Sequence, residues 1–211
     1  LDPVVQKAVN RVQPTELIGR VYGWAHELGF ASVNMDLIVG LPHQNVTNFA
    51  RTLDTVLEWS PDRFAIFAYA HVPWMKKHQK LIVETDLPDF ATRLALGELI
   101  HDRLSARGFV NIGLDHYARR DDALAIAHRI GKLRRNFQGY VADRSPWVIG
   151  IGASAISCLP QGFSQNDTDV ARYMATIGNS DFATARGIGV TNDDRLRGSI
   201  IHQLMCQQRV D

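Results

Sequence analysis

Residues 112–122, which read IGLDHYARRDD, join an apolar run to an unusual density of ionisable groups. A buried strand has no need of Asp115, His116 and Tyr117 at its end, whereas a strand that opens into a ligand site does. Carboxylate and imidazole groups transfer protons, bind metals and hold polar ligands. Asp115 and His116 are therefore candidate catalytic residues.

Two earlier strand candidates end in residues of the same kinds. The segment 31–41 carries Asp36 and is followed by His43, and the segment 64–72 ends near His71. Such residues at strand ends serve as metal ligands, as a hydrogen-bonded scaffold or as contacts to an organic ligand. Each histidine stands alone on its strand, without HxH or HxxH spacing, which disfavours the metal and leaves the other two readings open.

The segments between these strand candidates have helical patterns. Residues 45–59 repeat apolar side chains at helical spacing behind a possible Asn45 cap, and further helices are expected over 14–29 and from about Pro88 to Arg107. The alternation predicts an α/β fold with parallel strands joined by right-handed crossovers, either an open sheet or part of a barrel. Ligand sites in both architectures lie at the carboxyl ends of the strands.

Two arginine pairs flank a further helix expected over 121–133. Arg119 and Arg120 follow the third strand candidate, and Arg134 and Arg135 precede the sequence NFQGY. Guanidinium groups form bidentate pairs with carboxylates and phosphates. We therefore expect the four arginines to form a rim around a ligand that carries several carboxylates.

The character of the chain changes at about residue 136. A loop-like stretch is followed by IGIGASAIS, a small-residue strand or turn, and by a mixed segment that becomes helical after Asp167. We expect two domains, a barrel part over 1–135 and, over 136–211, a covering segment with the beginning of a C-terminal domain. The stretch GIGASA lacks the third glycine of a dinucleotide-binding turn, so nicotinamide binding is not expected.

Composition narrows the classes of partner. Lysine and arginine number 23 against 22 aspartates and glutamates, so net charge predicts neither a nucleic-acid nor a membrane partner. The two cysteines form no disulfide framework and no CxxC motif, which favours a cytoplasmic location. Both ends look cut, and we expect a fragment of a longer protein.

Seven motifs occur in a characteristic order: DPVVQKAVNRVQ, NMDLIVGLPHQ, PDRFAIFAYAHVP, IGLDHYARRDD, RRNFQGY, GIGASAIS with SQN, and QLMC. Together they resemble the oxygen-independent coproporphyrinogen III oxidases, or coproporphyrinogen dehydrogenases, of the radical S-adenosylmethionine (SAM) superfamily. The resemblance implies the second part of a partial (β/α) barrel of radical SAM type, followed by the start of a mainly helical C-terminal region.

The resemblance also implies a reaction. A [4Fe-4S] cluster, with ligands outside this chain, reduces SAM to give a 5′-deoxyadenosyl radical, and two SAM molecules are bound. The radical removes hydrogen from propionate side chains of coproporphyrinogen III, which lose carbon dioxide and become the vinyl groups of protoporphyrinogen IX in haem synthesis. A monomer served by an electron donor for the cluster is expected, with the present chain inactive alone.

The family pattern suggests roles for particular residues. It places Asn34, Asp36 and Ile112 near SAM, and it keeps Asp115 and His116 as catalytic candidates. The substrate-binding candidates are Arg119, Arg120, Arg134, Arg135, Gln138 and Tyr140. The chain departs from the family at Arg120, where proline is common, and at Val141-Ala142, where two threonines are common.

Two other functions remain open. One is a haem-binding chaperone of the same superfamily, which would hold a porphyrin without converting it. The other is a metal-dependent barrel hydrolase that uses His71, His116 and Asp115.

Overall fold

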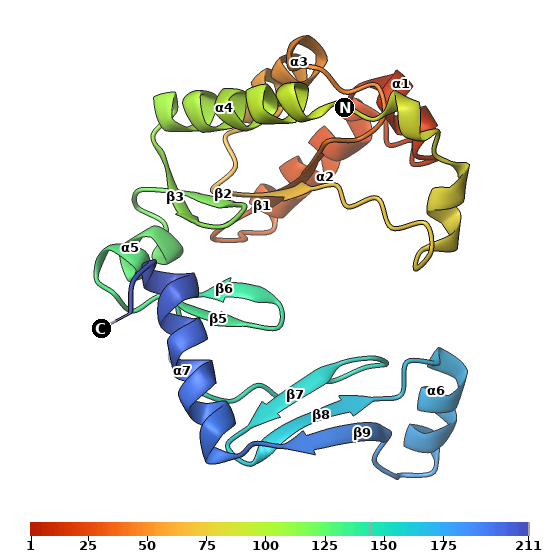
Figure 1. Ribbon diagram of the computed structural model, residues 1–211, viewed down its shortest axis with the longest axis vertical. Helices are drawn as coiled ribbons and strands as arrows, with labels where there is room; N and C mark the ends of the chain where they lie inside the picture. The colour runs from red at the N-terminus through yellow and green to blue at the C-terminus, as the bar shows by residue number, and fades with distance from the viewer. Residues whose placement is uncertain (144, 211) are drawn as a thin grey trace. The chain divides into compact units, whose positions relative to one another are not determined.

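The computed structural model describes residues 1–143 and 145–210 (Figure 1). The chain divides into two compact units, Leu1–Ile126 and Ala127–Asp211, and each is described by itself. The functional division expected after residue 135 stays a prediction. Within the described ranges, no helix combines the length and apolarity that crossing a membrane requires.

A four-stranded sheet, in the order β1-β2-β4-β3, forms the centre of the first unit. Strands β1 (Asn34–Val39) and β2 (Arg63–Ala68) are parallel neighbours, and α3 (Val46–Glu58) connects them. The expected strand–helix–strand step over this part of the chain is confirmed. Two helices precede it, α1 (Pro3–Ala8) and α2 (Thr15–Glu27).

The third strand candidate is a hairpin, so the expected continuous parallel strand is wrong. Strand β3 (Phe109–Gly113) ends at a turn, and β4 (His116–Arg119) returns between β3 and β2, antiparallel to both. Gly113 and Leu114 have positive φ angles of 145° and 46°, which reverse the chain. Gly113, the last residue of β3, therefore starts the reversal from inside an apolar run.

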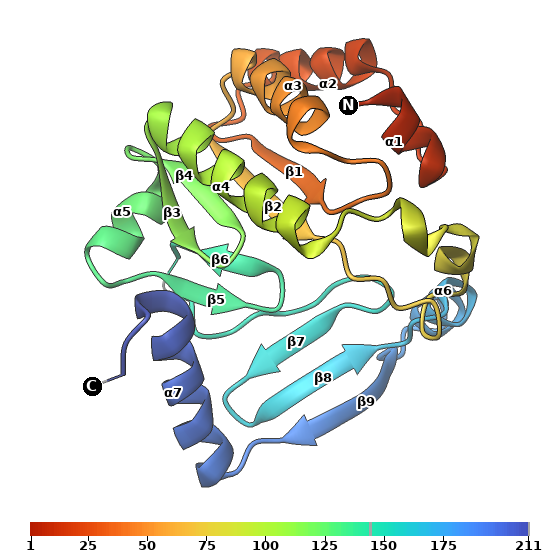
Figure 2. The same ribbon diagram turned by 45° about the horizontal axis from the view of Figure 1, so that its top comes forward.

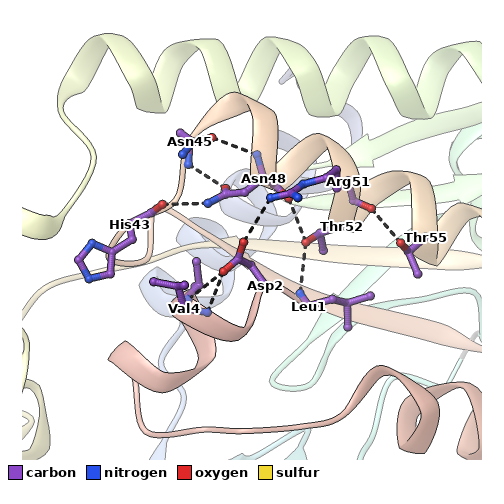
Figure 3. Close-up of polar contacts among 10 residues, drawn as sticks. Leu1, Asp2, Val4, His43, Asn45, Asn48, Arg51, Thr52 and Thr55 are labelled. Atoms are coloured by element: carbon purple, nitrogen blue, oxygen red, sulfur yellow. Dashed lines mark hydrogen bonds and ion pairs between the residues drawn. The ribbon is translucent and has the colours of Figure 1, made fainter.

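Helices α3 and α4 (Phe90–Ala106) begin at side-chain caps. The Asn45 side chain accepts from the Asn48 main-chain N–H at 3.0 Å, and the Asn48 side chain accepts from the Asn45 N–H at 2.9 Å (Figure 3). This reciprocal pair satisfies two donors that the first turn of α3 would otherwise leave open. Helix α4 begins similarly, with the Asp89 side chain accepting from Thr92 N–H, and Gly108 follows its end with a φ of 82°.

Helices α3 and α4 cover one face of the sheet. The side chains in this core are Phe49, Leu53, Val56 and Leu57 of α3, Leu96, Ile100 and Leu104 of α4, and Phe64, Ile66, Phe109 and Tyr117 of the sheet. Along β1, half-buried residues that pack on this core alternate with exposed ones. Asn34, Asp36 and Ile38 consequently point to the opposite face of the sheet.

Two short 3₁₀ helices lie between β2 and α4. They are η1 (Lys77–Leu81) and η2 (Glu84–Asp86). Helix α5 (Ala123–Arg129) follows β4 and is shorter than the helix expected over 121–133.

The second unit is built from antiparallel strands and two helices. A hairpin of β5 (Arg134–Asn136) and β6 (Gly139–Val141) precedes a three-stranded sheet. That sheet runs β7 (Ile156–Leu159), β8 (Gly162–Asn166) and β9 (Thr184–Gly189), seen side by side in Figure 2. The stretch IGIGASAIS enters β7, in line with its reading as a small-residue strand or turn.

The helices of this unit are α6 (Val170–Gly178), between β8 and β9, and α7 (Asn192–Gln207), after β9. The start of a helix after Asp167 was expected, whereas β9 had no clear strand signal in the sequence. A tight approach explains the glycine at the start of β8, since a Cβ on Gly162 would meet the Ile188 carbonyl oxygen at 2.0 Å.

Candidate functional site

The open face of the first sheet, opposite α3 and α4, holds a row of three aligned residues. Strand pairing aligns Asp36 with Ala65 on β2, and Ala65 with His116 on β4. Residues paired across neighbouring strands direct their side chains to the same face. Two strand spacings separate the outer Cα atoms by about 10 Å, and Ala65 between them is only 2% exposed.

The carboxylate in this row is oriented by its neighbour on the same strand. Asn34 Nδ2 donates to Asp36 Oδ1 at 2.6 Å, and both residues are exposed. A held carboxylate loses less rotational freedom when a ligand binds. Asp36 is therefore prepared to accept hydrogen bonds from hydroxyl or ammonium donors.

The next row of the open face is apolar. Ile38 pairs with Phe67, and both side chains are about two-fifths exposed, at 42% and 41%. The Phe67 ring meets the His116 ring edge to face, with centroids 6.0 Å apart. A polar row beside an aromatic shelf suits an organic ligand that has donors next to a flat apolar part.

Two glutamines fix the loops after β1 and β2, and the sequence reasoning missed both. Gln44 Oε1 accepts from Gly40 N–H at 2.7 Å and from Leu41 N–H at 2.9 Å. Gln79, which is buried, accepts from Val72 N–H at 2.6 Å and donates to the Ala70 carbonyl at 3.1 Å. These contacts hold both loops that border the carboxyl ends of the parallel strands.

The histidines of these loops contact neighbours rather than one another. His43 Nε2 lies 3.6 Å from Asp86 Oδ2, and His71 Nδ1 lies 3.0 Å from the Tyr69 hydroxyl. Burial raises the pKa of Tyr69. Among the residues that the structure describes, no group of three or more His, Cys, Asp or Glu side chains could hold a metal ion. The set proposed for a hydrolase is therefore not assembled.

The β3–β4 hairpin places its candidate residues differently from one another. Asp115 lies in the turn, half-buried, where its carbonyl accepts from Ile66 N–H at 2.8 Å. Ile112 is buried at an irregularity in the β3–β4 pairing. Tyr117 belongs to the core under α3 and α4, so its expected place in the ligand site is wrong.

Arg119 and Arg120 lie at the opposite end of β4 from Asp115. The main-chain N–H of Arg119 donates to the carbonyl of Asp62, which directly precedes β2, at 3.0 Å. The reversal of β4 thus takes this pair to the amino ends of the parallel strands. The expected position beside Asp115 is wrong, and a role in substrate binding stays a prediction.

The remaining candidates belong to the β5–β6 hairpin of the second unit. Arg135 pairs with Tyr140 across the hairpin, and its guanidinium lies 5.6 Å from the centroid of the tyrosine ring. The Tyr140 hydroxyl donates to the Met205 carbonyl of α7 at 2.8 Å. Gln138 lies in the hairpin turn, where its main-chain N–H donates to the Asn136 side chain at 2.8 Å.

A mainly apolar cavity of about 250 Å³ lies in the second unit. It is lined by Phe137, Ile156, Phe163, Ser164, Gln165, Arg186, Gly187 and Ile188. The rings of Phe137 and Phe163 meet edge to face with centroids 5.3 Å apart. The cavity thus places an apolar surface beside Gln138, and Arg186 supplies a positive charge at its lining.

The fold defines the class of protein. The structure matches coproporphyrinogen III oxidase from Escherichia coli, described as a radical SAM enzyme, with a TM-score of 0.94 and 40% sequence identity. The match covers 100% of this chain and 49% of that one. The chain therefore has the α/β fold of the corresponding part of a radical SAM enzyme, which confirms the expected fold class.

Sequence comparison finds relatives that share one name. The chain is 47% identical over 210 residues to the oxygen-independent coproporphyrinogen III oxidase of Bradyrhizobium diazoefficiens, covering 100% of this chain and 47% of that protein. It is 42% identical over 211 residues to the Thermostichus vulcanus protein of that name, covering 100% and 65%. No family model matches the chain.

Over its whole length the chain is therefore similar to the corresponding part of relatives named oxygen-independent coproporphyrinogen III oxidase. It spans about half the length of most of the curated relatives that it matches, with shares such as 46% and 47%.

Proposed function

We propose that this chain is part of an enzyme that converts two propionate side chains of coproporphyrinogen III into vinyl groups, giving protoporphyrinogen IX for haem synthesis. Similarity along the whole chain to relatives named for this oxidase supports the proposal. When bound, a [4Fe-4S] cluster and SAM supply the radical that removes hydrogen from the propionate. We place the cluster ligands outside this chain and propose two SAM molecules.

The observation that carries the proposal is the row formed by Asp36, Ala65 and His116 on the open face of the sheet. SAM offers ribose hydroxyls and an ammonium group as donors, together with a flat adenine ring. An oriented carboxylate accepts from the first two, and the Ile38–Phe67 shelf suits the ring. We propose that Asp36 binds SAM directly and that Asn34 positions the Asp36 carboxylate. Buried Ile112, on β3, would support the neighbouring strand β4.

Asp115 and His116 are proposed to act at the reacting end of this site. His116 is held edge to face against Phe67, which limits its rotation. A half-buried carboxylate and an imidazole are the groups that hold or transfer a proton as the propionate loses carbon dioxide.

The second unit is proposed to hold the porphyrinogen. Tyr140 is fixed by its bond to the Met205 carbonyl, and its ring in turn supports Arg135. Arg134, Arg135 and Gln138 would contact carboxylates of the substrate, and Tyr140 would position them. Arg119 and Arg120 remain further candidates, on sequence grounds.

A substitution at Asp36 tests the SAM assignment in the complete protein that contains this chain. Asp36→Asn removes the charge with little change in shape, and Asp102→Asn on the exposed side of α4 is the matched control. Hydrogen bonds to a charged group contribute about 1.5–3 kcal/mol, so we expect SAM binding to weaken about 10–100-fold. Calorimetric titration with SAM measures this, and an unchanged affinity in Asp36→Asn would exclude the assignment.

Two further measurements test the substrate assignment. Arg135→Ala should weaken porphyrin binding more than SAM binding, and equal losses would contradict its role. Detection of vinyl-porphyrin product by the complete, anaerobically purified protein would separate the oxidase from a haem-binding chaperone. We place this activity in the cytoplasm, in a monomer that receives electrons from a donor for the cluster.

A further inference from the structure

The segment that follows β2 exposes several large apolar side chains together. They are Trp74, Met75, Leu81 and Val83, with exposed fractions of 75%, 71%, 83% and 58%. We call these four residues, with the lysines among them, the Trp–Lys patch. Single exposed apolar residues are ordinary, but a cluster of this density on one short segment marks an interaction surface.

The patch is also positively charged. Lys76, Lys77 and Lys80 are interleaved with the apolar residues, and all three are exposed, as is His78. The acidic residues of the same connection come later, in η2, where Asp86 lies beside His43. The net charge of the whole chain is close to neutral and therefore does not reveal this local cluster of three positive charges within five residues.

Hydrogen bonds to a buried side chain hold the main chain of residues 70–80, and the apolar side chains of the patch face solvent. Buried Gln79 bonds to the main chain of Val72 and Ala70, and its own N–H donates to the Lys76 carbonyl at 2.9 Å. Met75 N–H donates to the Val72 carbonyl at 2.9 Å, which closes the turn that carries Trp74. Figure 1 shows this segment, in yellow between β2 and α4, extending away from the α3–α4 layer.

We propose that the Trp–Lys patch binds the surface of an anionic lipid bilayer. Trp74 and Met75 enter the headgroup region, and Lys76, Lys77 and Lys80 contact lipid phosphates. Stable attachment to a bilayer needs two signals, an inserted apolar element and a basic cluster, and the patch supplies both. The proposal is independent of the catalytic function.

The shape of the patch favours a bilayer over a protein partner. A stable protein interface buries about 800 Å² on each side, which demands a broad complementary surface. A short segment that projects from the sheet offers a tip instead, and a tip with tryptophan beside lysine matches the composition of the membrane–water interface. The result is peripheral attachment at the bilayer surface.

Vesicle sedimentation tests the proposal directly. The complete protein that contains this chain is mixed at low salt with vesicles of phosphatidylglycerol and phosphatidylcholine, or of phosphatidylcholine alone, and preferential binding to the anionic vesicles is expected. Lys76→Gln with Lys77→Gln should weaken binding about 25-fold, since each lysine near such a surface contributes about fivefold. Trp74→Ala should weaken it about tenfold through lost apolar burial.

Matched controls separate the patch from the rest of the molecule. Trp24→Ala removes another tryptophan, 52% exposed on α2, and Lys7→Gln with Arg20→Gln makes the same change in net charge on α1 and α2. Both controls should retain binding, and circular dichroism checks the fold of every variant.

Three results would overturn the proposal. They are equal binding to both kinds of vesicle, control losses as large as those of the patch variants, and binding to poly-glutamate without binding to vesicles. The last would assign the patch to an acidic protein partner instead.

Discussion

Asp122 joins three parts of the first unit, and its replacement by alanine gives a sharp test of the fold. Its side chain is 5% exposed and accepts from Arg63 Nε at 2.8 Å, Ser32 Oγ at 3.2 Å and Leu124 N–H at 2.7 Å. These contacts connect the segment before β1, the start of β2 and the start of α5. The carboxylate therefore closes the amino-end side of the sheet.

The cost of Asp122→Ala follows from these contacts. Removing one partner of a buried ion pair costs about 3–5 kcal/mol, but Arg63 is 28% exposed and regains part of this from water. Loss of the bond to Leu124 N–H adds about 1 kcal/mol, as for a helix cap. We expect a loss of about 3 kcal/mol in the free energy of unfolding of the first unit.

Denaturant unfolding followed by circular dichroism measures this loss, and the preceding residue supplies the control. Asp121 carries the same group, is 85% exposed and lies 3.8 Å from Arg119. Asp121→Ala should change stability by less than about 0.5 kcal/mol. Losses of similar size in the two variants, or less than about 1 kcal/mol for Asp122→Ala, would refute the proposed role of the buried carboxylate.

Three further outcomes are expected. Gln79→Ala should cost about 2 kcal/mol by leaving main-chain groups of the loop without partners and should speed amide exchange at Val72, whereas Lys80→Ala should do neither. Hydrogen bonds from the Thr191 hydroxyl and N–H lower the pKa of Asp194. The stability that this carboxylate gives to α7 is therefore present above the ordinary aspartate pKa and is lost as the pH falls through the lower pKa of the folded state. On acidification, the helicity measured by circular dichroism should fall less in Asp194→Ala than in the unchanged protein. Burial and, to a smaller extent, the charge of Arg134 lower the pKa of His202, so NMR should show its imidazole titrating below the ordinary value of about 6.5. The stability of the folded state should decline as the pH falls through that ordinary value. A His202 titration above about 6.5 would contradict the burial.

The elements with strong local signals could be predicted from the sequence. Asn45 with apolar residues at helical spacing indicated α3, and the β-rich segment 31–41 indicated β1. The β3–β4 hairpin was missed because Gly113 lies within an apolar run, and because Leu114 adopts a positive φ that its residue type does not announce. Turn geometry there depends on the pairing with β2, which a local pattern does not contain.

The candidate site, like the fold, could be predicted only where the sequence carries a local signal. Asp36 interrupts an apolar strand candidate, which marked it as a possible site residue, and the structure shows it exposed on one face of the sheet. Gln44 and Gln79 were missed because they bind main-chain groups of their own loops, and such contacts leave no spacing in the sequence. The main-chain partners of these glutamines can be identified only from the folded conformation of the loops.

The reversal at β4 also separates opposite charges within the first unit. A continuous strand would have carried Arg119 beyond Asp115, toward the carboxyl ends of the parallel strands. Instead β4 runs back from His116 to Arg119, a path of about 10 Å along the strand, which is about one Debye length at physiological salt. The arginine pair therefore lies away from Asp36, and in the SAM site that we propose, a cationic group such as the ammonium or sulfonium would approach a carboxylate that Arg119 does not neutralise. If Arg119 instead contributed to that site, Arg119→Ala would change SAM affinity as much as Asp36→Asn, and a titration of the two variants distinguishes these arrangements.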